Sequence, residues 1–366
     1  MAFFRYFWER TGRRGEQFIA LTDQSTPLEV LALDQGFRKV LVNPSNVGGR
    51  FSALSLFGLL PGALAGLDPE CLRVRAESMA TQCREANMAD NPGAALGAWL
   101  GEAANAGRDK LLVNANDPVA SFGLWAEQLV AESTGKEGKG ILPVSGWTGD
   151  SPEEDHARVT IGRAPSEIRA DGIPTQAFAV NDGYDLGAEF FRWEFATAVA
   201  CTVLGVNPFD QPNVAESKQK TAAVLDAAAS RDDPRPTRKS VIQGFIDDVK
   251  LGDYVALSAW VPPTATRDKQ LEDLRKILVE RFGVAVTVAY GPRFLHSTGQ
   301  LHKGGPGNGH FVQLLDPEPE ALAIPGTPYS FGDLIHAQAL GDYEALTRRG
   351  RTVLQLTDVD YLLEAI

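Results

Sequence analysis

The sequence predicts an α/β protein built on mostly parallel sheets. Three short apolar runs, at residues 18–23, 39–43 and 110–114, each end in a polar turn before a helical pattern begins, as buried parallel strands do. Strands and helices go on alternating towards the C-terminus, which indicates a doubly wound fold. With 366 residues, 44% of them hydrophobic and 22% charged, the chain has a globular composition and enough length for two domains.

The first third of the chain is predicted to be mainly helical, with two strands. A cap residue ahead of Pro27 opens one helix, because proline is favoured at the first helical position. The expected elements are a helix at 3–12, a strand at 18–23, a helix from Pro27, a strand at 39–43, a helix at 53–66 and a longer helical region at 69–107.

The rest of the chain shows the same alternation of strands and helices. Strands are expected at 110–114, 140–144, 158–162, 177–180, 254–261, 284–291, 310–315 and 353–358. Helices are expected at 119–134, 185–205, 215–229, 240–249, 267–282 and 331–348. The Gly- and His-rich residues 294–309 are expected to form a loop.

Charge and cysteine content limit the class of protein. The net charge of −12 disfavours bulk binding to nucleic acid or to an acidic membrane, so an anionic substrate needs a local basic pocket. The three cysteines, Cys71, Cys83 and Cys201, form neither a paired framework nor a metal motif, which indicates a reducing cytoplasm. No apolar run approaches the roughly 20 residues of a membrane span. We therefore expect a cytoplasmic protein without nucleic-acid or membrane partners.

A pair of polar residues in the expected helix 119–134 is the first candidate for chemistry. Gln128 and Glu132 lie four residues apart, so they share one face of that helix. Glu132 stands near the C-terminal end, where the helix macrodipole disfavours an anion, and a carboxylate there is a candidate base. Taken alone, the pair is equally compatible with a solvated helix end.

Three further stretches combine glycines with charged side chains, and all four candidates stand at ends of apolar strands, where open α/β sheets bind ligands. Gly48 and Gly49 precede Arg50, so a ligand could approach the backbone while the guanidinium faces it. The second stretch runs from Gln211 to Lys218, and the third is the loop 296–305. A flexible turn with a surface arginine, and a helix cap with a solvated lysine, are the plain alternatives for the first two.

The loop 296–305 carries two of the five histidines of the chain, His296 and His302, and the adjacent Lys303. Hydroxyls, backbone amides and cations together suit an anionic or polyhydroxylated ligand. The spacing of these histidines and His310 matches no standard metal motif and has no interleaved carboxylate, so we expect no metal.

Five stretches resemble glucose-6-phosphate isomerase, and most closely the isomerase half of proteins that fuse it to transaldolase. They include Gly-Gly-Arg-Phe-Ser, Ala-Glu-Gln-Leu-Val-Ala-Glu-Ser-Thr-Gly-Lys and Asn-Pro-Phe-Asp-Gln-Pro-Asn-Val, and they lie at 48–55, 123–144, 187–199, 207–214 and 296–306. The resemblance implies sugar-isomerase domains, each a three-layer αβα sandwich around a mostly parallel sheet. It implies the interconversion of glucose 6-phosphate and fructose 6-phosphate through a cis-enediol, without metal or redox cofactor.

The resemblance also assigns roles to residues. Glu132 is the base that moves the proton between C1 and C2, and Arg50 steadies the enediolate. Lys218 acts in opening the sugar ring. The implied substrate-binding residues are Gly48, Gly49, Gln128, Gln211 and Lys303.

The ring-opening histidine departs from the family pattern. The usual Thr-Asn-Gly-Gln motif shortly after the base is missing, and the nearest likeness is Ser-Thr-Gly-Gln at 297–300, followed by Leu301 and His302. We therefore expect His302 to open the ring, with His296 as the second candidate.

The expected domain organisation follows from the resemblance. Residues 1–108 are the remainder of a first sugar-isomerase domain whose N-terminal part, with its Ser/Thr-rich phosphate loop, is missing. Residues 109–366 are the second domain, with a C-terminal extension that carries the loop 296–305. Each lost phosphate hydrogen bond removes about 1.5–3 kcal/mol, so weakened substrate binding is expected.

Two other functions remain open. One is a non-catalytic module that binds sugar phosphates, which would have no need of a base at Glu132. The other is an isomerase that also accepts mannose 6-phosphate. The resemblance further implies a homodimer.

Overall fold

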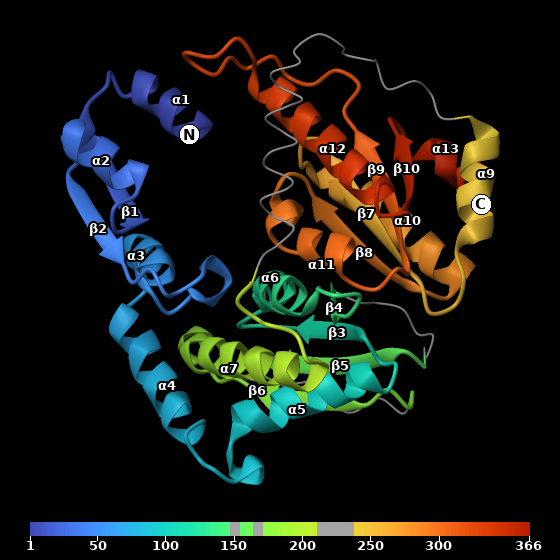
Figure 1. Ribbon diagram of the computed structural model, residues 1–366, viewed down its shortest axis with the longest axis horizontal. Helices are drawn as coiled ribbons and strands as arrows, with labels where there is room; N and C mark the ends of the chain where they lie inside the picture. The colour runs from blue at the N-terminus through green and yellow to red at the C-terminus, as the bar shows by residue number, and fades with distance from the viewer. Residues whose placement is uncertain (147–153, 164–170, 211–237) are drawn as a thin grey trace. The chain divides into compact units, whose positions relative to one another are not determined.

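The computed structural model describes residues 1–146, 154–163, 171–210 and 238–366 (Figure 1). They belong to two compact units, each assembled from separate stretches of the chain. The first unit comprises Met1–Ala95, Gly183–Phe195 and Ala321–Phe331, and the second comprises Leu96–Asp182, Ala196–Glu320 and Gly332–Ile366. The domain boundary expected at residue 108 stays a prediction, and the expected helix 215–229 lies outside the described residues.

The first unit contains a two-stranded parallel sheet with helices around it. The Oγ1 atom of Thr26 accepts a hydrogen bond of 3.3 Å from the backbone N–H of Glu29, which confirms the predicted helix start at Pro27. The elements are α1 (Ala2–Arg10), β1 (Ile19–Asp23), α2 (Pro27–Asp34), β2 (Lys39–Asn43), α3 (Leu56–Leu64) and α4 (Pro69–Gln82).

The single helical region expected at 69–107 is wrong, because two helices fill it. Helix α5 (Pro92–Asn105) starts afresh after α4 and a 3-10 turn. Pro92 has no N–H to continue a preceding helix, and Oδ1 of Asn91 accepts the N–H of Ala94 at 2.8 Å. A proline preceded by a capping asparagine therefore begins a new helix here.

The second unit contains two four-stranded sheets, and every strand pair in them is parallel. In the first sheet, of order β4-β3-β5-β6, helix α6 lies on one face and the later turns of α5 and α7 lie on the other (Figure 1). The bounds are β3 (Lys110–Ala115), α6 (Phe122–Thr134), β4 (Leu142–Ser145), β5 (His156–Gly162), β6 (Thr175–Ala179) and α7 (Leu186–Leu204).

The second sheet of this unit has the order β10-β9-β7-β8. Its buried residues join one core with those of the first sheet, in which Val144 and Ala131 lie with Val286 and Phe311. This arrangement confirms the predicted α/β class with mostly parallel sheets. The bounds are α9 (Lys239–Asp248), β7 (Tyr254–Trp260), α10 (Ala265–Phe282), β8 (Ala285–Tyr290), β9 (Gly309–Leu315), α12 (Phe331–Thr347), β10 (Thr352–Leu356) and α13 (Asp360–Leu363).

The loop expected at 294–309 is wrong over most of its length, because residues 294–296 and 299–304 are helical. A 3-10 helix, η5 (Arg293–His296), is followed by α11 (Gly299–Gly304). The guanidinium of Arg351 closes the end of α11, donating from Nε to the carbonyl of His302 at 3.2 Å and from Nη2 to that of Gly305 at 2.8 Å. Arg351 directly precedes β10 and is 49 residues from His302. Because this cap is so distant in the sequence, the glycine-rich local sequence could not predict the helix.

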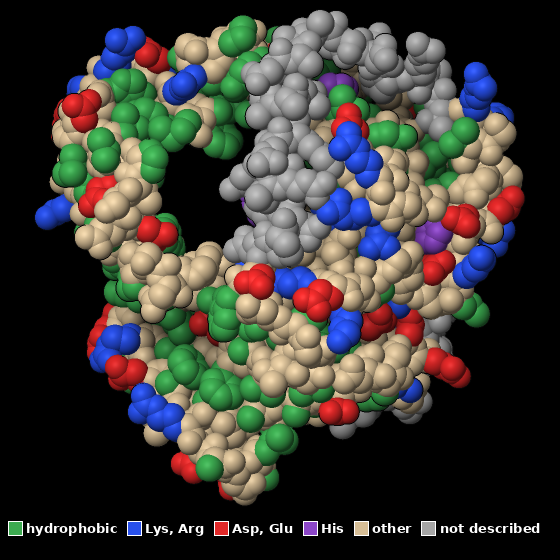
Figure 2. Space-filling model, viewed as in Figure 1, with side chains coloured by type: hydrophobic (Ala, Val, Ile, Leu, Met, Phe, Trp, Pro, Cys, Tyr) green, Lys and Arg blue, Asp and Glu red, His purple; other side chains and the backbone are tan. Residues whose placement is uncertain are grey.

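The remaining 3-10 helices are η1 (Gly15–Gln17), η2 (Gly49–Phe51), η3 (Met88–Asp90) and η4 (Gly183–Asp185). Among the described helices, none combines the length and apolar character needed to cross a membrane. On the face shown in Figure 2, acidic and basic side chains are interspersed rather than separated by sign.

Candidate active site

Helix α6 positions Glu132 near its C-terminal end. The Nε2 atom of Gln128 donates to Oε2 of Glu132 at 3.3 Å, so the predicted pairing of these two side chains on one helix face is confirmed. Glu132 is 5% exposed. Because α6 runs between the parallel strands β3 and β4, Glu132 lies near the edge where the strands begin, and the expectation that it stands at their carboxyl ends is wrong.

The Gly/Lys-rich turn after α6 connects three elements of the second unit. The ammonium of Lys136 donates to the carbonyl of Asn207, and that of Lys139 donates to the carbonyl of Leu204 at 2.6 Å. The N–H of Gly138 donates to the carbonyl of Gly304, at the end of α11, at 2.9 Å. Lys139 thus stabilises the C-terminal end of α7, where the helix dipole favours positive charge, and Lys136 contacts the turn just after it.

Lys136 therefore holds the start of the Asn-Pro-Phe-Asp-Gln stretch beside the end of α6. Gln211 and Lys218, which were expected to bind substrate and open the ring, lie outside the described residues. Their roles stay predictions.

His302 does not have the surroundings expected of a ring-opening group. It is 2% exposed, and aromatic rings of Phe311, Phe294 and Tyr254 lie with centroids 4.9, 5.9 and 6.2 Å from its own. Within the described ranges, neither ring nitrogen has a hydrogen-bond partner. Burial, with the nearby charges of Lys303 and Arg351, holds the pKa of His302 well below its ordinary value. The imidazole is a core side chain that favours its neutral form, and these surroundings do not suit the expected acid–base role.

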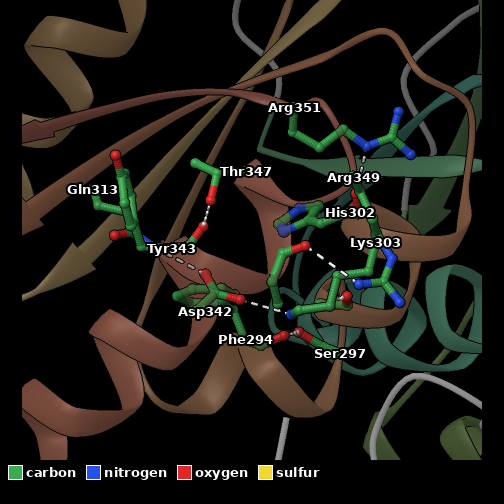
Figure 3. Close-up of polar contacts among 12 residues, drawn as sticks. Phe294, Ser297, His302, Lys303, Gln313, Asp342, Tyr343, Thr347, Arg349 and Arg351 are labelled. Atoms are coloured by element: carbon green, nitrogen blue, oxygen red, sulfur yellow. Dashed lines mark hydrogen bonds and ion pairs between the residues drawn. The ribbon is translucent and has the colours of Figure 1, made fainter. Parts of the chain in front are cut away.

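The side chain of Lys303 points towards Asp342 (Figure 3). Its Nζ atom lies 2.6 Å from Oδ1 of Asp342, and the two side chains are 3% and 1% exposed. The other oxygen, Oδ2, accepts from Nε2 of Gln313 at 3.0 Å. A lysine held in this buried ion pair is not oriented towards a substrate phosphate, and its expected role as a substrate contact stays a prediction.

His296 has the opposite environment from His302. It ends η5, and its side chain is exposed. The next residue, Ser297, is buried, and its Oγ donates to Oε1 of Glu127 on α6 at 2.9 Å. The exposed histidine is therefore attached through its neighbour to the helix that carries Glu132.

The Gly-Gly-Arg stretch belongs to the first unit. Arg50 lies in η2 and is 3% exposed, with its guanidinium carbon 5.6 Å from the ring centroid of Phe51. A Cβ atom at Gly48 or Gly49 would meet no other atom within 4 Å among the described residues. The backbone beside Arg50 thus has the open space that the sequence led us to expect, and the roles of Gly48, Gly49 and Arg50 stay predictions.

Sequence reasoning missed the residues that hold the candidate site together. Glu127 and Lys136 lie inside the stretch that carries Glu132, yet both were passed over as ordinary helix and turn residues. Asp342 lies in α12, where nothing in its local sequence distinguishes it. The helical period could have revealed Glu127, because its position falls on the inner face with Val130 and Thr134, both buried.

Known proteins resemble this chain in sequence. No family model matches the chain. The glucose-6-phosphate isomerase of Heliobacterium modesticaldum is 30% identical over 260 residues, covering 57% of this chain and 58% of that protein. The enzyme of the same name from Parabacteroides distasonis is 29% identical over 263 residues, with the same coverage.

The fold has a counterpart among solved structures. The crystal structure of a glucose-6-phosphate isomerase from Chlamydia trachomatis superimposes with a TM-score of 0.50 at 18% identity, covering 64% of this chain and 57% of that one. The sequence match spans a little over half the length of the curated relatives, 58%. By sequence and by fold, this chain is similar to glucose-6-phosphate isomerases over more than half of its length.

Proposed function

We propose that this chain interconverts glucose 6-phosphate and fructose 6-phosphate by proton transfer through a cis-enediol. The observation that carries the proposal is the hydrogen-bonded pair of half-buried Gln128 and buried Glu132, in a chain similar to glucose-6-phosphate isomerases. One carboxylate that reaches both C1 and C2 is enough for the transfer, and the amide of Gln128 holds that carboxylate in one orientation. Proton transfer of this kind needs no metal or redox cofactor.

The other roles are those that the resemblance implies, with one change. Arg50 supplies a permanent positive charge for the enediolate oxygen, since a guanidinium does not lose its proton. Opening the hexose ring needs proton transfer at O1 and O5, which we assign to His296 and Lys218. His296 replaces His302 in this role because only the former is exposed. Gln211 is proposed to bind the substrate.

A coupled assay tests the proposal directly. Fructose 6-phosphate would be supplied to the full chain, and glucose 6-phosphate detected through its dehydrogenase. Glu132→Gln removes the base and should lower kcat by about 10²–10⁴-fold, the usual contribution of a general base. Glu137→Gln is the matched control, because Glu137 is an exposed carboxylate in the following turn.

Three outcomes decide between the functions left open. Turnover that Glu132→Gln abolishes and Glu137→Gln retains supports the isomerase. Binding of glucose 6-phosphate by calorimetry without turnover in any variant would instead establish a non-catalytic binding module. Conversion of mannose 6-phosphate in the same assay would extend the substrate range.

We also propose three properties that rest on the resemblance and on composition. The first is a homodimer, which sedimentation velocity would test. The second is kinship with the isomerase half of transaldolase fusions. The third is a cytoplasmic location, since Cys71, Cys83 and Cys201 form no disulfide with one another, as is usual in a reducing compartment.

A further inference from the structure

A buried carboxylate next to the candidate base contacts the segment that carries His296. Glu127 is 5% exposed and precedes Gln128 in α6. Its Oε1 accepts a hydrogen bond of 2.9 Å from Oγ of Ser297, a residue 170 positions later. Ser297 is 3% exposed and follows His296 directly. The bond therefore joins the helix of Glu132 to the residue next to the exposed histidine.

The groups that interact electrostatically with Glu127 lie in or directly after η5, the 3-10 helix that ends at His296. Burial raises the pKa of Glu127, while the positive charge of Arg293 and the hydrogen bond from Ser297 act in the opposite direction. Arg293 begins η5 and His296 ends it. Glu127 on α6 thus interacts with the guanidinium of Arg293 at the start of η5 and with the hydroxyl of Ser297 just after the end of η5.

A second bond holds the segment further along α6. The Nε2 atom of Gln300 donates to the carbonyl of Gly135 at 3.0 Å, and this bond is buried. The two anchors, Glu127 in α6 and Gly135 just after its end, lie on either side of Glu132 in the sequence. The segment from Ser297 to Gln300 cannot slide along the helix without breaking one of them.

We propose that Glu127 is a positioning residue that, through Ser297, fixes His296 relative to Glu132. This inference rests on the proposed function, because it concerns the place of the ring-opening group relative to the base. Proton transfer demands that the acting group lie within hydrogen-bond reach of its target. A displacement of about 1 Å in such a group can lower the rate about 10²-fold.

Four variants separate positioning from general stability. Ser297→Ala removes the donor, and Glu127→Met keeps the chain length but removes the acceptor. Glu127→Gln retains an acceptor oxygen and should rescue. Leu271→Ala is the matched control, because it removes buried contacts from the same unit in α10.

The kinetic readout is turnover of glucose 6-phosphate deuterated at C2. Ser297→Ala and Glu127→Met should lower kcat by about 10–100-fold with little change in KM. Their deuterium isotope effect should fall towards one, because ring opening becomes slower than proton transfer. Glu127→Gln and Leu271→Ala should keep the isotope effect of the unsubstituted chain. Equal isotope effects in all variants would overturn the inference while leaving the isomerase proposal intact.

A second readout does not depend on turnover. The chain has only five histidines, so the Cε1–H signal of His296 can be assigned by NMR with a His296→Ala variant. That signal should shift or broaden in Ser297→Ala and Glu127→Met, and return in Glu127→Gln. An unchanged signal in Glu127→Met would overturn the inference whether or not the chain is active. Failure of the isomerase proposal would show instead as an absence of turnover in the unsubstituted chain.

Discussion

The ammonium of Lys303 and the carboxylate of Asp342 form an ion pair of 2.6 Å in which both side chains are almost fully buried. It joins α11 to α12 within the second unit, and Gln313 of β9 completes the contacts of the carboxylate. Breaking a buried pair on one side is costly, because the remaining charge has lost both its partner and its water. The pair therefore fixes α11, the helix that follows His296.

Replacing one member of this pair should destabilise the fold. Lys303→Met should lower the free energy of unfolding by about 3–5 kcal/mol, measured by urea denaturation. Adding Asp342→Leu should recover part of that loss, because the uncompensated carboxylate is removed. A raised KM for fructose 6-phosphate with unchanged stability would instead restore Lys303 as a substrate contact.

His302 should make the stability of the fold depend on pH. Its pKa is depressed in the folded chain, so below about pH 6.5 the unfolded chain binds a proton that the folded chain does not. The stability that His302 contributes is complete above that pH and falls as the pH is lowered, by up to about 1.4 kcal/mol per pH unit.

His302→Phe should remove this part of the slope in urea denaturation between pH 7 and 5. His336→Phe, at a half-buried histidine of α12, is the matched control. An identical slope in His302→Phe and the unsubstituted chain would show that His302 takes up its proton over the same pH range in the folded and the unfolded chain.

The two histidines should differ in their effect on turnover. His296→Ala should lower kcat for glucose 6-phosphate by about 10²–10⁴-fold, since it removes an acid–base group. His302→Phe should leave kcat much closer to that of the unsubstituted chain, because a phenyl ring fits among Phe294 and Phe311. The coupled assay distinguishes them, and the reverse order of effects would return the ring-opening role to His302.

A glycine at position 135 should be required for the close packing of the end of α6 against α11. A Cβ atom there would lie 2.4 Å from Cα of Leu301 and 2.7 Å from the carbonyl oxygen of Ala131. Gly135→Ala should therefore force the helices apart, with a loss of stability of about 1–3 kcal/mol and a fall in kcat.

Gly138→Ala is the control for that substitution. Gly138 has a φ of +75°, and among the described residues no atom lies within 4 Å of the place that its Cβ would take, so the change acts on the backbone conformation alone. It should destabilise by about 1–2 kcal/mol and leave kcat unchanged. Equal kcat in both variants would mean that the α6–α11 contact does not affect the site.

Much of the fold could be predicted locally. The strand at 39–43 is found at the residues expected, and that at 110–114 is longer by one residue, because buried parallel strands form continuous apolar runs between polar turns. The one helical region at 69–107 failed where Asn91 and Pro92 restart the helix, although both signals are local. Helix α11 was not predicted, because the arginine that caps it, Arg351, is 49 residues from His302.

The sequence by itself determined the α/β class, most strand positions and the pairing of Gln128 with Glu132, since each depends on residues a few positions apart. Only the tertiary structure gives His296 and His302 different environments, although they are the same residue type six positions apart. Burial among Tyr254, Phe294 and Phe311 makes one of them a neutral core side chain and leaves the other at the surface. The same holds for Lys303, whose charge is taken up by Asp342, a partner that local sequence cannot identify.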